Sequence, residues 1–151
     1  MKKFTIIGIT IIMFFFKNSV AANYDKIFFD FKIDSISGEV IDLNDYKDKG
    51  LIVLGVPSNS FKQEKNSNAD IKDFCEVNFN INFPLTTLTE VKGENAHEIY
   101  QWAKENYGKS AVPKWNFYKI LINRQGKIED TFSSLTNPMS KKITNIIEKI
   151  L

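Results

Sequence analysis

The feature that most limits the possible folds is a short apolar run, LIVLGV (51–56), near the middle of the chain. A polar, lysine-rich stretch, DYKDKG (45–50), precedes it, and Pro57 follows it. Six residues are short for a buried helix, but they fit a strand that is covered on both faces. The run therefore predicts an α/β fold in which this strand lies inside the sheet.

Changes in hydrophobic periodicity predict the other elements. Alternation around Ser37-Gly38 predicts a β-hairpin in 28–43, and the turn NRQG (123–126) predicts a second hairpin from strands 117–122 and 128–132. Helical spacing predicts one helix after Ser67, one over 96–106 and one that begins at Lys141. The order hairpin, strand, helix, helix, hairpin, helix is that of an α/β sandwich of the thioredoxin kind.

Residues 1–21 have the three-part pattern of a secretory signal peptide. MKK is followed by the apolar stretch FTIIGITIIMFFF and then by the small residues of Ser19-Val20-Ala21. The apolar stretch is short for a transmembrane span, although an uncleaved anchor is the alternative. We expect cleavage near Ala21 or Ala22 and export to the periplasm or the medium. One domain over 22–151 would remain, in an oxidising compartment.

Composition excludes several classes of function. The 20 basic and 18 acidic residues are interspersed, which argues against a nucleic-acid-binding surface. The single cysteine cannot form an internal disulfide, so any redox chemistry involves a second molecule. His97 is the only histidine and is expected to be a capping or packing residue at the start of its helix. Without a Cys or His cluster or a glycine-rich phosphate loop, neither a metal site nor a cofactor is expected.

Three short motifs occur in a characteristic order: PSNSF (57–61), GENAH (93–97) and KWNF (114–117). Together they resemble the glutathione peroxidase family of thiol peroxidases, over residues 30–151. The resemblance implies a thioredoxin-like fold and the reduction of hydroperoxides in response to oxidative stress. It also implies a thiol reductant as partner, either glutathione or a thioredoxin-like protein.

The resemblance also implies a set of site residues. In the family a peroxidatic thiolate attacks the peroxide, and a Trp, an Asn and a Gln donate hydrogen bonds that favour the thiolate. These three match Trp115, Asn116 and Gln63, although the spacing before Gln63 is tighter and a plain surface position is its alternative. Cys75 matches the resolving cysteine of thioredoxin-dependent members; its alternative is a small apolar residue on the buried face of a helix.

One family segment has no counterpart in this chain. The family places its peroxidatic cysteine or selenocysteine after a strand and before a helix, whereas this chain passes directly from Lys49 to Gly50 and the run 51–56. About one strand–helix unit is missing, so we expect a glutathione peroxidase-type fold with one central strand and one helix deleted. The strand at 51–56 would lose a neighbour. Then either the strands rearrange, or a partner chain fills the gap, or the product is only marginally stable.

Two functional hypotheses follow. The chain is either a peroxidase-family copy that lacks its nucleophile and is weakly active or inactive, or a non-catalytic thioredoxin-fold module that binds a partner in the periplasm.

Overall fold

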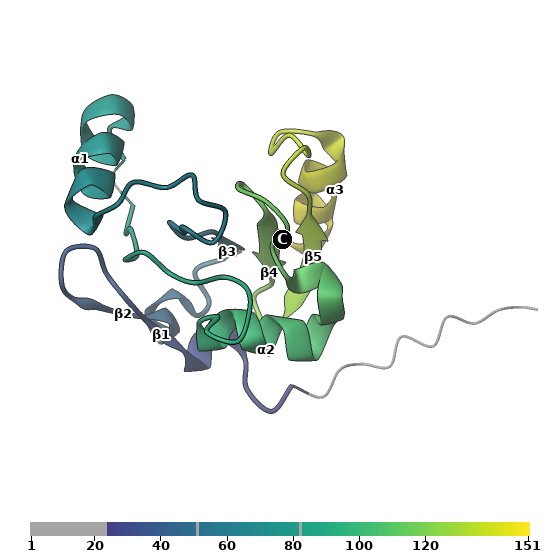
Figure 1. Ribbon diagram of the computed structural model, residues 1–151. Coiled ribbons are helices and arrows are strands. Elements are labelled where there is room, and N and C mark those ends of the chain that lie inside the picture. Colours follow the sequence, from purple (N-terminus) through teal and green to yellow (C-terminus); the bar gives the residue numbers. More distant parts are fainter. Residues whose placement is uncertain (1–23, 51, 82) are drawn as a thin grey trace, which may run out of the picture.

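The computed structural model describes residues 24–50, 52–81 and 83–151 (Figure 1). The helices and strands follow in the predicted order: β1 (Lys32–Asp34), β2 (Val40–Asp42), β3 (Ile52–Leu54), α1 (Asn68–Phe79), α2 (Glu98–Tyr107), β4 (Lys119–Ile122), β5 (Ile128–Phe132) and α3 (Lys141–Ile150). Three short 3-10 turns join them: η1 (Phe28–Asp30), η2 (Leu43–Tyr46) and η3 (Gly108–Ala111). The predicted signal peptide lies outside the described residues. Within the described ranges no helix is both long and apolar enough to span a bilayer.

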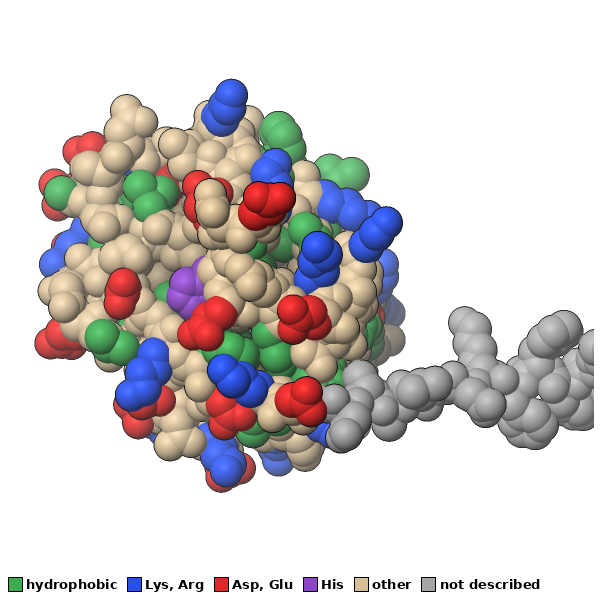
Figure 2. Space-filling view, turned by 60° about the horizontal axis from the view of Figure 1, so that its bottom comes forward, with side chains coloured by type: hydrophobic (Ala, Val, Ile, Leu, Met, Phe, Trp, Pro, Cys, Tyr) green, Lys and Arg blue, Asp and Glu red, His purple; other side chains and the backbone are tan. Residues whose placement is uncertain are grey.

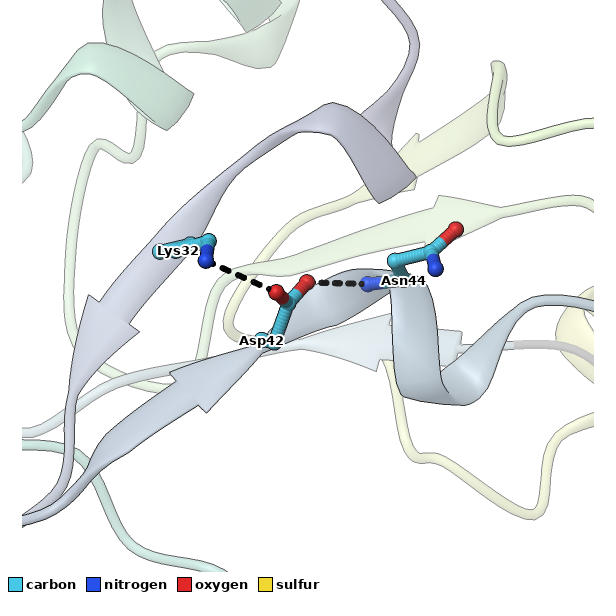
Figure 3. Close-up of polar contacts among 3 residues, drawn as sticks. All are labelled: Lys32, Asp42 and Asn44. Atoms are coloured by element: carbon cyan, nitrogen blue, oxygen red, sulfur yellow. Dashed lines mark hydrogen bonds and ion pairs between the residues drawn. The ribbon is translucent and has the colours of Figure 1, made fainter.

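The N-terminal hairpin forms as predicted, with β1 and β2 antiparallel and Lys32 opposite Asp42. Lys32 Nζ lies 2.9 Å from one carboxylate oxygen of Asp42, and the backbone N–H of Asn44 donates to the other at 3.0 Å (Figure 3). Both contacts favour the charged carboxylate and lower the pKa of Asp42, with the Lys32 hydrogen bond as the larger cause. The side chain of Asp42 thus joins the two strands of the hairpin and caps the start of η2.

The second sheet has three antiparallel strands in the order β3-β4-β5, visible at the centre of Figure 1. Alternate residues of β4 point to opposite faces. On one face Ile120 and Ile122 join the main core with α2; on the other, Leu121 packs with Phe132 beneath α3. The isoleucine stripe predicted for the last helix, which covers this second face, is therefore confirmed.

The prediction that β3 is covered on both faces is wrong. Leu54 is buried and Ile52 packs against the main core, but the side chain of Val53 is 55% exposed. In the described part of the chain, β4 is the only strand that pairs with β3. Val53 therefore stands at the margin of the sheet, beyond the part that α3 covers.

The main core also holds the residues that precede η1. The indole N–H of Trp102 donates to the carbonyl of Lys26 at 2.8 Å, and the ring of Tyr24 lies 5.7 Å from the Trp102 ring. Phe28, Phe31 and Ile99 complete this part of the core. The chain from Tyr24 onward is thus part of the folded domain.

The predicted caps of α1 and α2 are present, although α2 begins at Glu98 and not at the predicted Ala96. Ser67 Oγ accepts from the N–H of Asp70 at 3.1 Å, which is one half of the predicted capping box. His97 Nδ1 accepts from the N–H of Ile99 at 3.3 Å, so the histidine caps α2 as predicted. Acidic and basic side chains lie side by side across the face drawn in Figure 2, in agreement with the near-neutral composition.

Helix α1 projects from one side of the molecule (Figure 1). Ile71 is its one buried residue among those described, and Asn68 Oδ1 anchors it by accepting from the N–H of Leu88 at 3.0 Å. Val77 and Phe79 are exposed. The predicted helix is present, but it buries less of its apolar surface than an amphipathic core helix does.

Candidate functional site

Two of the predicted site residues meet between the loop after β3 and the segment before β4. Asn116 Nδ2 donates to Gln63 Oε1 at 2.5 Å, although the two residues lie 53 positions apart in the sequence. This contact fixes the orientation of both amides. Both amide hydrogens of Gln63 and the second amide hydrogen of Asn116 take no part in this contact and can serve as donors to a third group.

Trp115 precedes Asn116 in the sequence, and its ring contacts the ring of Phe61, which lies on the same loop as Gln63. Its ring centroid is 5.6 Å from that of Phe61, with the ring planes tilted by 48°. Lys92 Nζ lies over the ring of Phe61, 4.2 Å from its centroid. Trp115 is 52% exposed, so it is a surface aromatic rather than a core residue. The structure therefore brings Gln63, Trp115 and Asn116 into one site.

A hydrogen-bonded cluster holds the loop that carries Phe61 and Gln63. Ser60 Oγ donates to the carboxylate of Glu90 at 2.8 Å and accepts from the N–H of Val91 at 3.2 Å. Ser58 Oγ donates to Ser60 Oγ at 3.0 Å. Ser60 and Glu90 thus position the site, and sequence analysis missed that role because the two residues lie 30 positions apart and belong to no common motif.

Cys75 is not part of this arrangement. It lies half-buried on α1, and its backbone carbonyl accepts from the N–H of Asn80 at the end of that helix. Among the contacts of the described residues, none joins Cys75 to Gln63, Trp115 or Asn116. Figure 1 shows α1 on a different side of the molecule from β4. The thiol and the three donors are thus separate features of the fold.

The described residues were also compared with two other kinds of site, a metal centre and a ligand cavity. Within the described ranges no group of three or more His, Cys, Asp or Glu side chains is arranged to hold a metal ion. A cavity of about 370 Å³ lies between the residue pair Asp25-Lys26 and α2, where Trp102 and Glu105 line it. None of the predicted site residues lines this cavity.

Comparison with known proteins gives consistent matches. The family model described as glutathione peroxidase matches residues 28–104. Glutathione peroxidase-like peroxiredoxin gpx1 of Schizosaccharomyces pombe is 38% identical over 109 residues, which cover 70% of this chain and 68% of that protein. The glutathione peroxidase homolog BsaA of Bacillus subtilis is 40% identical over 111 residues, which cover 70% of this chain and 68% of that protein. Hydroperoxy fatty acid reductase gpx1 of Synechocystis is 38% identical over 117 residues, with 72% and 68% covered.

Two solved structures resemble the whole described domain. The apo form of Trgpx gives a TM-score of 0.58 at 24% identity and covers 82% of this chain and 97% of its own. T. cruzi GPX1 gives a TM-score of 0.54 at 18% identity, and the match covers 83% of this chain and 94% of that one. At these identities the likeness concerns the fold alone, and it confirms the predicted thioredoxin-like architecture of the glutathione peroxidase type.

Proposed function

Because the chain belongs to the glutathione peroxidase family, we propose that it is a member that keeps the thiolate-stabilising donors but lacks the peroxidatic cysteine. Such a protein reduces hydroperoxides weakly or not at all. The observation that carries the proposal is the separation of donors and thiol. Gln63 and Asn116 are hydrogen-bonded to each other beside Trp115, while Cys75, the one cysteine of the sequence, lies on α1.

The chemistry of the family explains why this separation matters. A peroxidatic thiolate attacks a peroxide oxygen, releases the alcohol or water and becomes a sulfenic acid, which a second thiol must reduce. Indole and amide N–H groups favour the thiolate because they donate hydrogen bonds without adding charge. Cys75 has no such donors around it among the contacts described. In the role of a resolving thiol it would have no sulfenic acid to attack.

The pairing of the strands supports the proposed deletion. A central strand and its helix that were removed between Lys49 and Gly50 would leave the flanking strands either apart or paired directly. Val53 of β3 is directly opposite Leu121 of β4, so the sheet has the second arrangement. This pairing corresponds to the expectation that the remaining strands rearrange.

The proposal also includes export. Residues 1–21 carry the pattern of a signal peptide, and the segment from Tyr24 onward packs into the core, which fits a mature chain that begins just before it. Mass spectrometry of the protein expressed in a bacterium tests this directly. We expect a periplasmic product that begins near Ala22. A full-length, membrane-bound product would instead identify an uncleaved anchor.

Peroxide turnover tests the catalytic part of the proposal. The purified chain is assayed with hydrogen peroxide and a fatty acid hydroperoxide, with glutathione or thioredoxin as the thiol donor. The Synechocystis reductase is the positive control. We expect no turnover above that of a Cys75→Ser variant. A clear rate that depends on Cys75 would contradict the proposal, because the thiol on α1 would then be the nucleophile.

The second candidate function is a partner-binding module without catalysis. It is favoured by the exposed apolar side chains of α1, Val77 and Phe79, which a degenerate enzyme has no need to present. Far-UV circular dichroism with chemical unfolding separates the two candidates. A cooperatively folded but inert chain supports the module, whereas a largely unfolded chain supports the degenerate peroxidase.

A further inference from the structure

The cavity of about 370 Å³ beside α2, here called the α2 cavity, plays no part in the candidate site. Five of its lining residues lie on α2 at positions 98, 101, 102, 105 and 106, and this spacing places them on one side of the helix. The pair Asp25-Lys26 lines it from the start of the described chain, which passes below α2 in Figure 1. Two of the lining residues, Phe31 and Trp102, are almost fully buried. The α2 cavity therefore combines aromatic surface with polar groups.

The charges that line the α2 cavity are mostly negative. Three carboxylates (Asp25, Glu98 and Glu105) and one ammonium group (Lys26) give it a formal charge of −2, whereas the whole chain carries +2. None of the ion pairs among the described residues involves these three carboxylates. Lys26 Nζ instead lies 5.3 Å from the centroid of the Phe31 ring. The α2 cavity therefore favours a cation that Lys26 does not supply.

The start of the mature chain can bring a cation to this place. The ring of Tyr24 lies 5.7 Å from that of Trp102, and the carbonyl of Lys26 accepts from the Trp102 indole N–H at 2.8 Å, so this segment is fixed against α2. Cleavage after Ala21 or Ala22, as proposed above, creates an α-ammonium group one or two residues before Tyr24. Since a residue spans at most about 3.6 Å, this group stays within about 9 Å of the Cα of Tyr24.

Two of the carboxylates are within that reach. Glu98 lies four residues before Trp102 on α2 and Glu105 lies three residues after it, so each is about one helical turn, or about 5.4 Å along the axis, from the residue that Tyr24 contacts. A cation attached to the chain also has an effective concentration in the millimolar range, which gives it an advantage over a free cation.

We propose that the α-ammonium group of the mature chain docks in the α2 cavity, beside Glu98 and Glu105. Docking ties the new end of the chain to α2 and stabilises the folded state only after cleavage, because an uncleaved chain has a neutral peptide bond at this position. The inference rests on the proposed export for its biological setting. The contact itself depends only on where the chain begins.

Acetylation of the N-terminus tests the proposal, because it removes the positive charge. A chain of residues 22–151, which contains every residue of the described fold, is prepared by specific proteolysis and compared with its acetylated form in urea unfolding at pH 7. We expect acetylation to raise the equilibrium constant for unfolding about threefold, which is the scale of a partly exposed ion pair. In a Glu98→Gln/Glu105→Gln double variant the two forms should unfold alike. Glu148→Gln, an exposed change on α3, is the matched control and should preserve the difference.

NMR titration of the α-amino group gives a second measurement that needs no variant. The pKa of an α-amino group in an unfolded chain is about 8. In the folded chain the carboxylates beside it favour the charged form and should raise this pKa by about half a pH unit, which corresponds to the threefold effect. The stability that the group contributes is then complete below about pH 8 and is lost as the pH rises through the raised pKa.

Three results would overturn the proposal. The first is an acetylated chain as stable as the free chain, with a pKa of about 8 in the folded state. The second is an acetylation effect that persists in the Glu98→Gln/Glu105→Gln variant. The third is stabilisation by added putrescine, through Glu98 and Glu105, that is equal in the free and acetylated chains, since the α2 cavity would then take a free cation. The mass of the exported product tests export separately, so a chain that cells leave uncleaved contradicts the export alone.

Discussion

Gly126 is a position at which a single methyl group should disturb the fold. It ends the turn between β4 and β5, with φ at +71°, and its carbonyl accepts from the N–H of Phe28 at 2.8 Å. A Cβ placed on Gly126 would lie 2.8 Å from Cδ2 of Phe29 and 3.1 Å from Cβ of Ile27. Because Phe29 is buried, its ring cannot swing away into solvent. We therefore predict that Gly126→Ala is strongly destabilising.

The expected loss in the free energy of unfolding for Gly126→Ala has two parts. Placing an alanine in the left-handed backbone region costs about 1–2 kcal/mol. Forcing a methyl group against a packed ring costs about 1–3 kcal/mol more, through displacement of the ring or the turn. We therefore expect the free energy of unfolding to fall by about 2–5 kcal/mol, which is a large share of the roughly 5–15 kcal/mol available to a small domain.

Urea unfolding followed by circular dichroism measures this loss. The matched control is Gly38→Ala, because Gly38 also has a positive φ, of 90°, but a Cβ there meets no atom within 4 Å. The control should lose only the backbone part. In a Phe29→Leu background the effect of Gly126→Ala should shrink, since the smaller side chain leaves room. Equal losses for Gly126→Ala and Gly38→Ala would refute the argument that Phe29 is what requires glycine in this turn.

Three further predictions concern titration and capping. Burial, together with the nearby charge of Asp130, raises the pKa of Tyr107 to about 12. Its contribution to stability is therefore complete below about pH 10 and is lost as the pH rises through about 12. Tyr107→Phe should remove one late step from the ultraviolet titration of tyrosine. The pKa of Asp42 is lowered by the hydrogen bond from Lys32, so its contribution is present above about pH 4 and is lost at lower pH. Asp42→Asn should therefore weaken the acid dependence of unfolding, whereas an unchanged profile would contradict the assignment. Ser67→Ala removes the cap of α1 and should cost about 1 kcal/mol, seen as faster amide exchange in the first turn of that helix.

Much of the fold could be predicted because its signals are local. The periodicity of residues 141–150 and the turn residues of NRQG each lie within one element, where spacing alone distinguishes helix from strand. The capping roles of Ser67 and His97 are likewise decided within a few residues. The environment of β3 was predicted wrongly, because exposure at Val53 depends on which strand and helix lie beside it.

The residues of the candidate site could be predicted from short motifs, but their contacts could not. The motifs identified Gln63, Trp115 and Asn116, but only the folded chain brings the two amides to 2.5 Å from each other. The support that Ser60 receives from Glu90 has no counterpart in any local pattern.

The sequence by itself thus determined the order of elements, the family resemblance and the absence of a second cysteine, since all three are properties of neighbouring residues or of composition. Only the tertiary structure decided that β3 pairs with β4, that Cys75 lies apart from the donors, and that Gly126 contacts Phe29. The physical reason is that these contacts join residues distant in sequence. Their energies depend on how the whole chain packs, and no short stretch of sequence contains that information.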